Sequence, residues 1–288
     1  MTSPYAAAAA GIVERSAAAF VRAVPRDPAD EGYFGPASVT WRVAGDLSAP
    51  VAGLRALLIQ ALHPLAMAGV DQHSDWRQDP VGRLAATSAY LATLAYADRA
   101  TADRAAQQVR RVHEHVRGTF EGQPYAASDP DLLLWVHTTF VDSGLAACEL
   151  LGNPADRDEY AREMAVSAAL LGVPHAQIPS DSACLHDFIT SCVPRLCVTA
   201  AARETAAYLL DPPGMDDEIA ELWQDIRDAV IATLPPWALS LYEIPAPPPL
   251  TPERRAEIRG ALGLLDAVSI GEPGVLEARR RIALRMRG

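Results

Sequence analysis

The chain has 288 residues, of which half are apolar and 21% are charged, a balance typical of a folded globular protein. All basic residues are arginines, 25 against 36 acidic residues, so the formal net charge is −11. This balance argues against non-specific nucleic-acid binding and against docking on anionic membranes, because both need basic surface. The absence of lysine also removes Schiff-base chemistry and a lysine-anchored phosphate loop.

The compartment is predicted from the cysteines and from the apolar segments. The cysteines form no CxxC pair and lack zinc-finger spacing, so we expect buried free thiols in a reducing compartment; they are Cys148, Cys184, Cys192 and Cys197. The N-terminus has no basic region of the signal-peptide kind, and Glu14 interrupts its apolar run. The later apolar stretch 49–70 holds Arg55 and His63, which makes it too polar for a spanning helix. These features predict a cytoplasmic protein without membrane insertion.

In chain order, the pattern predicts helices punctuated by prolines, because alternating apolar residues are scarce and Ala, Leu, Glu and Arg are abundant. The predicted helices are 5–24, 50–68, 80–97, 101–119, 130–151, 155–171, 181–210, 215–233, 251–268 and 273–286, with an ordered loop or a short helical turn over 31–50. Pro194 should kink or break the helix that contains it. The prolines of 245–249 indicate a stiff extended connector. We therefore expect one all-α domain over 1–288, with about ten helices.

Three helix starts have a clear mechanism. Asp79, Asp129 and Thr251 each precede a proline, which places a side-chain acceptor at the N-cap and a proline at the first helical position. Arg83 and Thr87 then lie four residues apart, on one face of the helix that starts after Asp79. A solvated arginine is the ordinary interpretation, and a contact to a carboxylate or another anion is the alternative.

The first candidate ligand is His113. Val109, Val112, His113 and Val116 follow at helical spacing, which places His113 on an apolar face. His115 lies about 200° around the same helix, on the arginine side, so the two imidazoles cannot share one metal ion. A core histidine and a ligand both fit this pattern.

Other histidines remain candidates on the same grounds. His137 lies in the apolar run LLLWVHTTF, where a neutral imidazole needs a hydrogen-bond partner, so a core histidine is the simpler interpretation. His63 precedes Pro64 near the end of a buried helix, and His73 lies in the polar segment DQHSDWRQDP. The usual signatures of serine hydrolases, dinucleotide-binding folds, zincins and EF-hands are absent, as is an ExxH helix pair of the di-iron kind.

Five segments, in order, resemble the latex-clearing-protein (rubber oxygenase) and MpaB-like family. They are GYFGPASVTW (32–41), LRALLIQALHPLAMAGVDQHS (54–74), DPVGRLAATSAYL (79–91), RRVHEHVRG (110–118) and YAASDPDLLLWVHTTFVDSG (125–144). The resemblance is clearest over 30–175. Each motif is short, and their common order is what makes the resemblance specific.

The resemblance implies an all-α fold around a buried haem b, with a histidine as the proximal iron ligand. The family's Arg-x3-Thr motif and its following helix histidine fall on Arg83, Thr87 and His113. It therefore implies His113 as the axial ligand, with His137 as second choice. Imidazole is a common axial ligand of haem iron. Arg83, with Arg110 or Arg117, would pair with the propionates.

One position departs from the family. Rubber-cleaving members carry a lysine directly before the motif threonine, where this chain has Ala86. The distal side of the iron must therefore be capped differently or stay open. We do not expect polyisoprene as the substrate.

The sequence thus predicts a haem-b-dependent oxygenase or oxidase that uses O2 or peroxide on a small hydrophobic molecule, and a homodimer is compatible with it. Thr87, His63 and His73 are candidates for hydrogen bonding or proton delivery on the distal side. One alternative is a non-haem metal enzyme that uses His63, His113, His137 and Asp142. Another is a non-catalytic haem-binding sensor or carrier.

Overall fold

The predicted N-caps shape the starts of three helices. The Asp79 carboxylate accepts a hydrogen bond from the backbone N–H of Gly82 at 2.8 Å, and that of Asp129 accepts one from Asp131 at 2.9 Å. The Thr251 hydroxyl accepts from the backbone N–H of a residue in the first turn of its helix. Each cap satisfies a donor that the first turn leaves unpaired, so these boundaries are confirmed.

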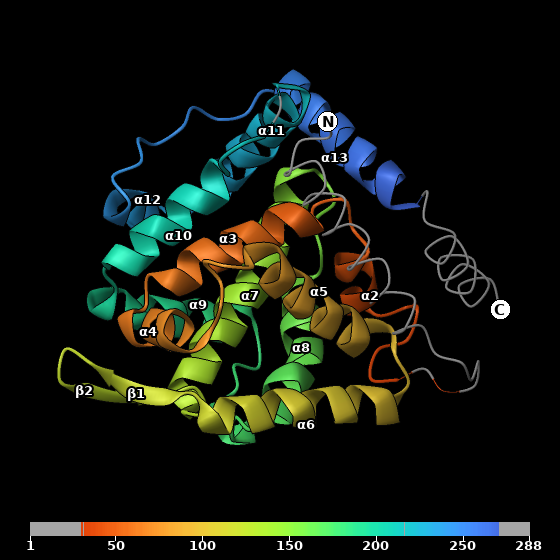
Figure 1. The fold of residues 1–288 in the computed structure, drawn as a ribbon. Coiled ribbons are helices and arrows are strands. Elements are labelled where there is room, and N and C mark those ends of the chain that lie inside the picture. The colour runs from red at the N-terminus through yellow and green to blue at the C-terminus, as the bar shows by residue number, and fades with distance from the viewer. Residues whose placement is uncertain (1–29, 31, 216, 271–288) are drawn as a thin grey trace.

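The computed structural model describes residues 30, 32–215 and 217–270 (Figure 1). Its helices are α2 (Val39–Ala44), α3 (Ala49–Ala61), α4 (Pro64–His73), α5 (Pro80–Tyr96), α6 (Arg99–His115), α7 (Pro130–Leu150), α8 (Arg157–Leu171), α9 (Ser182–Cys192), α10 (Ala200–Leu210), α11 (Asp217–Thr233), α12 (Pro236–Leu241) and α13 (Pro252–Ile270), with 3₁₀ turns η1 (His175–Gln177) and η2 (Val193–Arg195). The strands are β1 (Arg117–Phe120) and β2 (Gln123–Ala126). The predicted mostly all-α fold is confirmed.

Helix α7 forms the centre of the molecule. Thirteen of its 21 residues are buried, and it packs against α3, α8, α9 and α11 (Figure 1). Trp135 of α7 and Leu58 of α3 are among the largest side chains that are fully buried. A helix that is apolar on most sides must lie inside the domain, as the sequence predicted.

The predicted helix 50–68 is two helices, α3 and α4, which meet at 103°. The cause is Pro64, which lacks a backbone N–H and disfavours helical backbone at the residue before it. His63 accordingly has extended backbone (φ −82°, ψ 112°) and forms the N-cap of α4. The break moves His63 from a helix end to the junction of α3 and α4.

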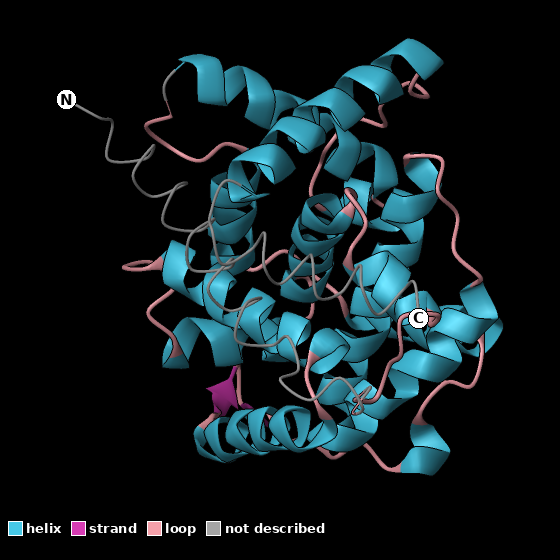
Figure 2. Ribbon diagram, turned by 90° about the vertical axis from the view of Figure 1, so that its right-hand side faces the viewer, coloured by secondary structure: helices cyan, strands magenta, loops and turns pink. Residues whose placement is uncertain are grey.

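The predicted helix 101–119 ends at His115 and continues into an antiparallel hairpin of β1 and β2. Arg117 pairs with Ala126, and the turn contains Gly122 at φ +80°. Gly118 in β1 disfavours a helix, and a side chain there would collide with the Tyr125 hydroxyl. Figure 2 shows this hairpin as the only strand pair of the described residues.

The remaining predictions are mostly confirmed. The predicted helix 181–210 is broken around Pro194 into α9, η2 and α10, and the prolines of 245–249 lie in an irregular connector between α12 and α13. The short α12 was not predicted. The predicted helices 5–24 and 273–286 lie outside the described residues.

The cysteine prediction is half right. All four cysteines are free thiols, and Cys148 and Cys192 are buried, but Cys184 and Cys197 are exposed. The last two lie at the start of α9 and in the loop after η2, where the chain runs along the surface.

No single helix of the described residues is long and apolar enough to cross a membrane. The pair α3 and α4 meets the length and composition requirement only when its two parts are taken together across their 103° bend.

Candidate functional site

The first turn of α5 fixes where Arg83 and Thr87 lie. Gly82 is required because a Cβ there would lie 2.0 Å from the capping carboxylate of Asp79. Arg83 follows directly, and the Thr87 hydroxyl donates a hydrogen bond to the Arg83 carbonyl at 3.1 Å. Both side chains are exposed to solvent. The sequence places them on one face of α5, and the structure agrees.

Arg83 is accessible to solvent and is also closely surrounded by protein. The surrounding protein lowers its pKa through desolvation, although the side chain keeps much of its accessible surface. The charged form of Arg83 is therefore less well solvated than that of a free arginine.

His113 of α6 lies within reach of the Arg83 charge. The pKa of His113 is lowered first by burial and second by the Arg83 guanidinium, so its imidazole is neutral at pH 7. The side chain is half-buried, and its Nδ1 atom is buried without a hydrogen-bond partner among the described residues. The structure thus brings together Arg83 and His113, which the sequence named separately, and Thr87 lies one helical turn from Arg83 on α5.

This arrangement fits a haem. A buried imidazole nitrogen without a partner is uncommon in proteins and calls for an explanation such as a ligand. A neutral imidazole is the form that binds haem iron, and a guanidinium beside it is suited to a propionate. The residues present are therefore compatible with haem b.

The elements around this pair form a ring. Helix α6 packs on α5 and α8, and α8 packs on α7. The ring closes through a cluster of apolar side chains from α4, β2, α7 and the residue after α6: Ala68, Tyr125, Leu132 and Val116. In Figure 1, α5 crosses in front of α7 while α6 runs below both.

His137 lies on α7, with a pKa lowered to about 4 by burial. It is two helical turns before Gly144, which contacts Tyr160 of α8, so both share the α8 side of the helix. No charged group adds to the effect of burial on its pKa. This placement favours a neutral core histidine, and the axial role of His137 stays a prediction.

His63 belongs to a different environment. It is 6% exposed, its ring centroid lies 5.9 Å from that of Trp135, and its Nδ1 atom has no hydrogen-bond partner among the described residues. Its pKa falls to about 4, first through burial and second through the charge of Arg195. The arginine that acts on His63 is therefore Arg195, whereas the arginine that acts on His113 is Arg83.

His73 lies at the C-terminal end of α4, where its ring meets that of Tyr125 edge-on at 6.2 Å. It faces an open groove of about 420 Å³ along one side of α6. The lining residues are His73, Gln108, Arg111, Val112, His115 and Val116. The structure therefore groups His73 with the outer side of α6, and His113 is not part of this groove.

The residues around His113 differ from the predicted apolar stripe. Val112 is 51% exposed, and Val116 lies beyond the end of α6 as its C-cap. His115 is exposed, and its Nδ1 atom lies 2.7 Å from the Arg111 carbonyl, as expected for the arginine side. Arg117 lies in β1, beyond the end of α6, and is exposed; its propionate contact stays a prediction.

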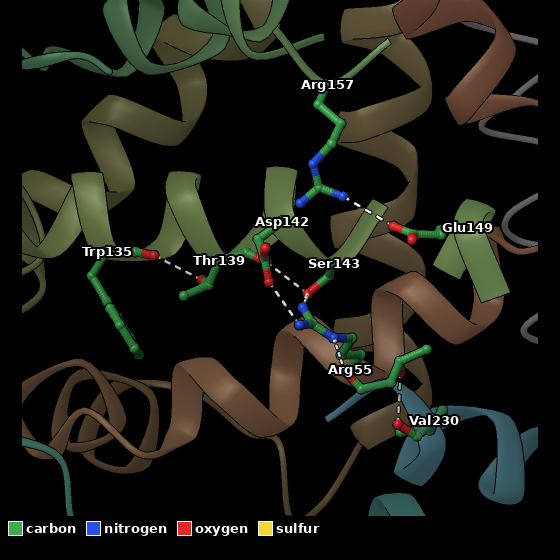
Figure 3. Close-up of polar contacts among 9 residues, drawn as sticks. Arg55, Trp135, Thr139, Asp142, Ser143, Glu149, Arg157 and Val230 are labelled. Carbon is green, nitrogen blue, oxygen red and sulfur yellow. Dashed lines mark hydrogen bonds and ion pairs between the residues drawn. The ribbon is translucent and has the colours of Figure 1, made fainter. Parts of the chain in front are cut away.

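Asp142, a member of the alternative metal cluster, is held by Arg55 (Figure 3). The Arg55 guanidinium lies 2.7 Å from its carboxylate, donates to the Ser143 hydroxyl at 2.7 Å and donates to the Thr233 carbonyl at 2.9 Å. Among the residues described, no three His, Cys, Asp or Glu side chains are grouped so that they could hold a metal ion. The alternative cluster of His63, His113, His137 and Asp142 is therefore wrong.

Sequence reasoning missed this buried ion pair, although a signal was present. Arg55 stands in the apolar run LRALL and Asp142 in the apolar helix α7. A charge in such a run must find a partner of opposite sign. The missing information was which two helices pair, since the two residues are far apart in the sequence.

Comparison with known proteins gives a family. Residues 41–267 match the family described as "ER-bound oxygenase mpaB/B'/Rubber oxygenase, catalytic domain". No curated protein and no solved structure matches the chain significantly. The match runs from α2 into α13 and includes Arg83, Thr87 and His113. Because it covers well over half of the sequence, this chain belongs to the MpaB and rubber oxygenase family and carries its catalytic domain.

Proposed function

We propose that the protein is a haem-b-dependent oxygenase or oxidase that acts on a small hydrophobic molecule with O2 or peroxide. The observation that carries the proposal is the half-buried His113, whose Nδ1 atom has no partner among the described residues and which lies beside Arg83 in a chain of an oxygenase family. Haem, when bound, supplies the redox chemistry, and the chain supplies ligation, orientation and exclusion of water.

Each residue of the site has a separate task in this proposal. His113, whose imidazole is neutral, would hold the iron, and Arg83 would pair with a propionate. The Thr87 hydroxyl already donates its hydrogen bond to the Arg83 carbonyl, so its oxygen lone pairs remain to accept one from a ligand. Arg110 and Arg117, from the basic end of α6 and the start of β1, are additional partners for the propionates. Ala86 leaves the lysine position of the rubber-cleaving relatives without a side-chain donor.

Neighbouring histidines allow a matched test of the axial assignment. His113→Ala should abolish retention of one equivalent of haemin, whereas His115→Ala should retain it, because His115 is exposed and bonded to its own helix. The measurement is an absorption titration of each apoprotein with haemin. If His113→Ala keeps the wild-type spectrum and stoichiometry, the axial assignment is wrong and His137→Ala is the next variant.

The same samples separate an enzyme from a carrier. An oxygenase needs an open coordination position, so cyanide or imidazole should change the spectrum of the ferric protein. Unchanged spectra at saturating cyanide and imidazole would favour a carrier with both axial positions filled.

A further inference from the structure

The outer groove, as we name the groove along α6 that His73 faces, has a volume of about 420 Å³, within the range of roughly 300–1,000 Å³ typical of small-molecule pockets. It is lined by His73, Gln108, Arg111, Val112, His115 and Val116. Four of these follow at i, i+3, i+4 and i+7 from position 108, so they form one face of α6. His113 lies about 150° around the helix from the centre of that face. The outer groove is therefore separate from the proposed haem site.

A second element completes the outer groove. His73 is the last residue of α4, and its ring meets that of Tyr125 in β2 edge-on at 6.2 Å. Helix α4 packs on β1 and β2, and Figure 1 shows it beside the hairpin at the end of α6 that leads into β1. The fold therefore brings His73 to residues of α6 that are distant in the sequence.

The Arg111 guanidinium has no carboxylate partner among the described residues. Its Nε and Nη2 atoms donate to the side-chain oxygen of Gln108, a neutral acceptor, at 3.2 and 2.6 Å. The NH2 group of Gln108 is a further donor. The His115 Nδ1 atom lies 2.7 Å from the Arg111 carbonyl; since a carbonyl only accepts, Nδ1 carries the ring proton and Nε2 remains for a ligand.

The outer groove is electropositive in an acidic molecule. None of its six lining residues is acidic, although the chain has 36 Asp and Glu residues and a net charge of −11. Asp71 of α4 is paired with Arg77 at 2.6 Å, and Glu114 lies on a different face of α6. Two imidazoles could also hold a metal ion, but the Arg111 guanidinium in the same groove repels a cation. The charge therefore favours an anion.

Hydrocarbon accompanies this charge. Val112, next to Arg111, is 51% exposed, and Val116 is half-buried. The four α6 residues of the groove span about 10 Å of the helix axis. An inorganic anion would leave the two valines in water, whereas a ligand with a hydrocarbon part would cover them, which is favourable.

We propose that the outer groove binds a small organic carboxylate with an aliphatic chain. The carboxylate pairs with Arg111 and accepts a hydrogen bond from Gln108, and the chain lies over Val112 and Val116. Guanidinium and carboxylate match in shape and charge, which makes arginine the usual residue for this task. The proposal does not depend on haem, because none of these residues belongs to the site at His113.

Calorimetric titration of the purified protein with octanoate tests the site. We expect saturable binding of one octanoate per chain, weakened about tenfold by Arg111→Gln, because a charged hydrogen bond is lost. Arg104→Gln removes an exposed arginine of the same helix that bonds Thr101, and it should leave the affinity unchanged. Absence of binding, or equal effects of the two variants, would overturn the proposal.

The two parts of the ligand are tested separately. Acetate has the charge without the chain and 1-octanol has the chain without the charge, so each should bind at least about tenfold more weakly than octanoate. Val112→Ser should weaken octanoate binding and leave acetate binding unchanged. Tighter binding of inorganic phosphate or of Ni²⁺ than of octanoate would reject an organic carboxylate as the ligand.

A photoreactive octanoate that carries a diazirine locates the bound chain. After irradiation, peptide mapping by mass spectrometry should find the label within 108–116 or at His73, and Arg111→Gln should reduce it. His113→Ala should be labelled as the wild type is, which keeps this test separate from that of the haem. Label confined to other peptides would contradict the proposal.

Discussion

At the scale of single residues, the site depends on how Arg83 and burial act on His113. Both effects disfavour the imidazolium, so the ring stays neutral, and its Nδ1 atom has no hydrogen-bond partner among the described residues. A neutral ring with a free nitrogen is ready to bind a metal, whereas a protonated ring is not. The guanidinium, which lowers the pKa of His113, also carries the positive charge that a propionate needs.

The first prediction concerns this charge. Arg83→Met should raise the pKa of His113 in the apoprotein, because it removes a nearby cation. The measurement is an NMR titration of the His113 ring proton, assigned with His113→Ala. As a control, Arg111→Met removes an exposed arginine that bonds Gln108 and should leave the pKa of His113 unchanged. An unchanged pKa in Arg83→Met would show that the two side chains do not interact.

The second prediction concerns pH and stability. His137 has a pKa of about 4 in the fold against an ordinary value of 6.5, so the unfolded chain binds more protons between these values. The stability that the neutral His137 ring contributes is therefore fully present above pH 6.5. It is lost as the pH falls toward 4, by about 3 kcal/mol for this one group.

Urea unfolding of the wild type and of His137→Leu at pH 7 and pH 4.5 measures this effect. The variant should lose less stability on acidification than the wild type, since apolar surroundings accept leucine at both pH values. His115→Leu, at an exposed position, should follow the wild type. Parallel losses in wild type and His137→Leu would contradict a buried neutral His137.

At the scale of elements, a single buried arginine joins three helices. Arg55 of α3 is 3% exposed and bonds α7 through Asp142 and Ser143 and the last turn of α11 through Thr233 (Figure 3). Burial lowers its pKa, and the Asp142 carboxylate opposes that shift. The pair thus keeps α7, which carries His137, in a fixed position relative to α3.

The third prediction is the cost of breaking that pair. Asp142→Asn should destabilise the fold by about 3 kcal/mol, because it leaves the buried guanidinium without its counter-charge. Arg157→Met should cost less than about 0.5 kcal/mol, because Arg157 and Glu149 form an exposed pair on the same region. Urea unfolding at pH 7 measures both. Similar values for the two variants would show that the Arg55 pair contributes no more than a surface pair.

Local sequence signals predicted which segments form helices better than they predicted the residues at which those helices end. Proline and capping residues marked most boundaries, since they act on the backbone within one turn. Pro64 was overlooked as a break because the apolar pattern continues across it. The hairpin after His115 was missed because its four-residue strands are too short to show alternation.

At the scale of the whole molecule, the site is built from elements far apart in the sequence. Arg83 and His113 belong to α5 and α6, which pack on each other, and α6 packs in turn on α8. The order of five short motifs indicated the family and hence His113 and Arg83. The resemblance did not indicate the Arg55 pair, which follows from packing alone.

The fourth prediction concerns stability of the whole domain. A ligand held by side chains of separate helices binds only the folded chain, so haemin at about 100 times its Kd should stabilise the protein by about 2.7 kcal/mol. For a domain of this size, that is a rise in Tm of about 4–5 °C. Thermal unfolding should show the rise in wild type and His115→Ala and not in His113→Ala. Equal shifts in all three proteins would indicate haemin binding elsewhere.

The central claim is that the chain holds one haem b through His113. The most direct test is the absorption spectrum and pyridine haemochrome of the protein purified from haem-supplemented cells. We predict a Soret band and about one b-type haem per chain. Purified, folded protein without haem, and with iron or zinc found by metal analysis instead, would contradict the haem site at His113.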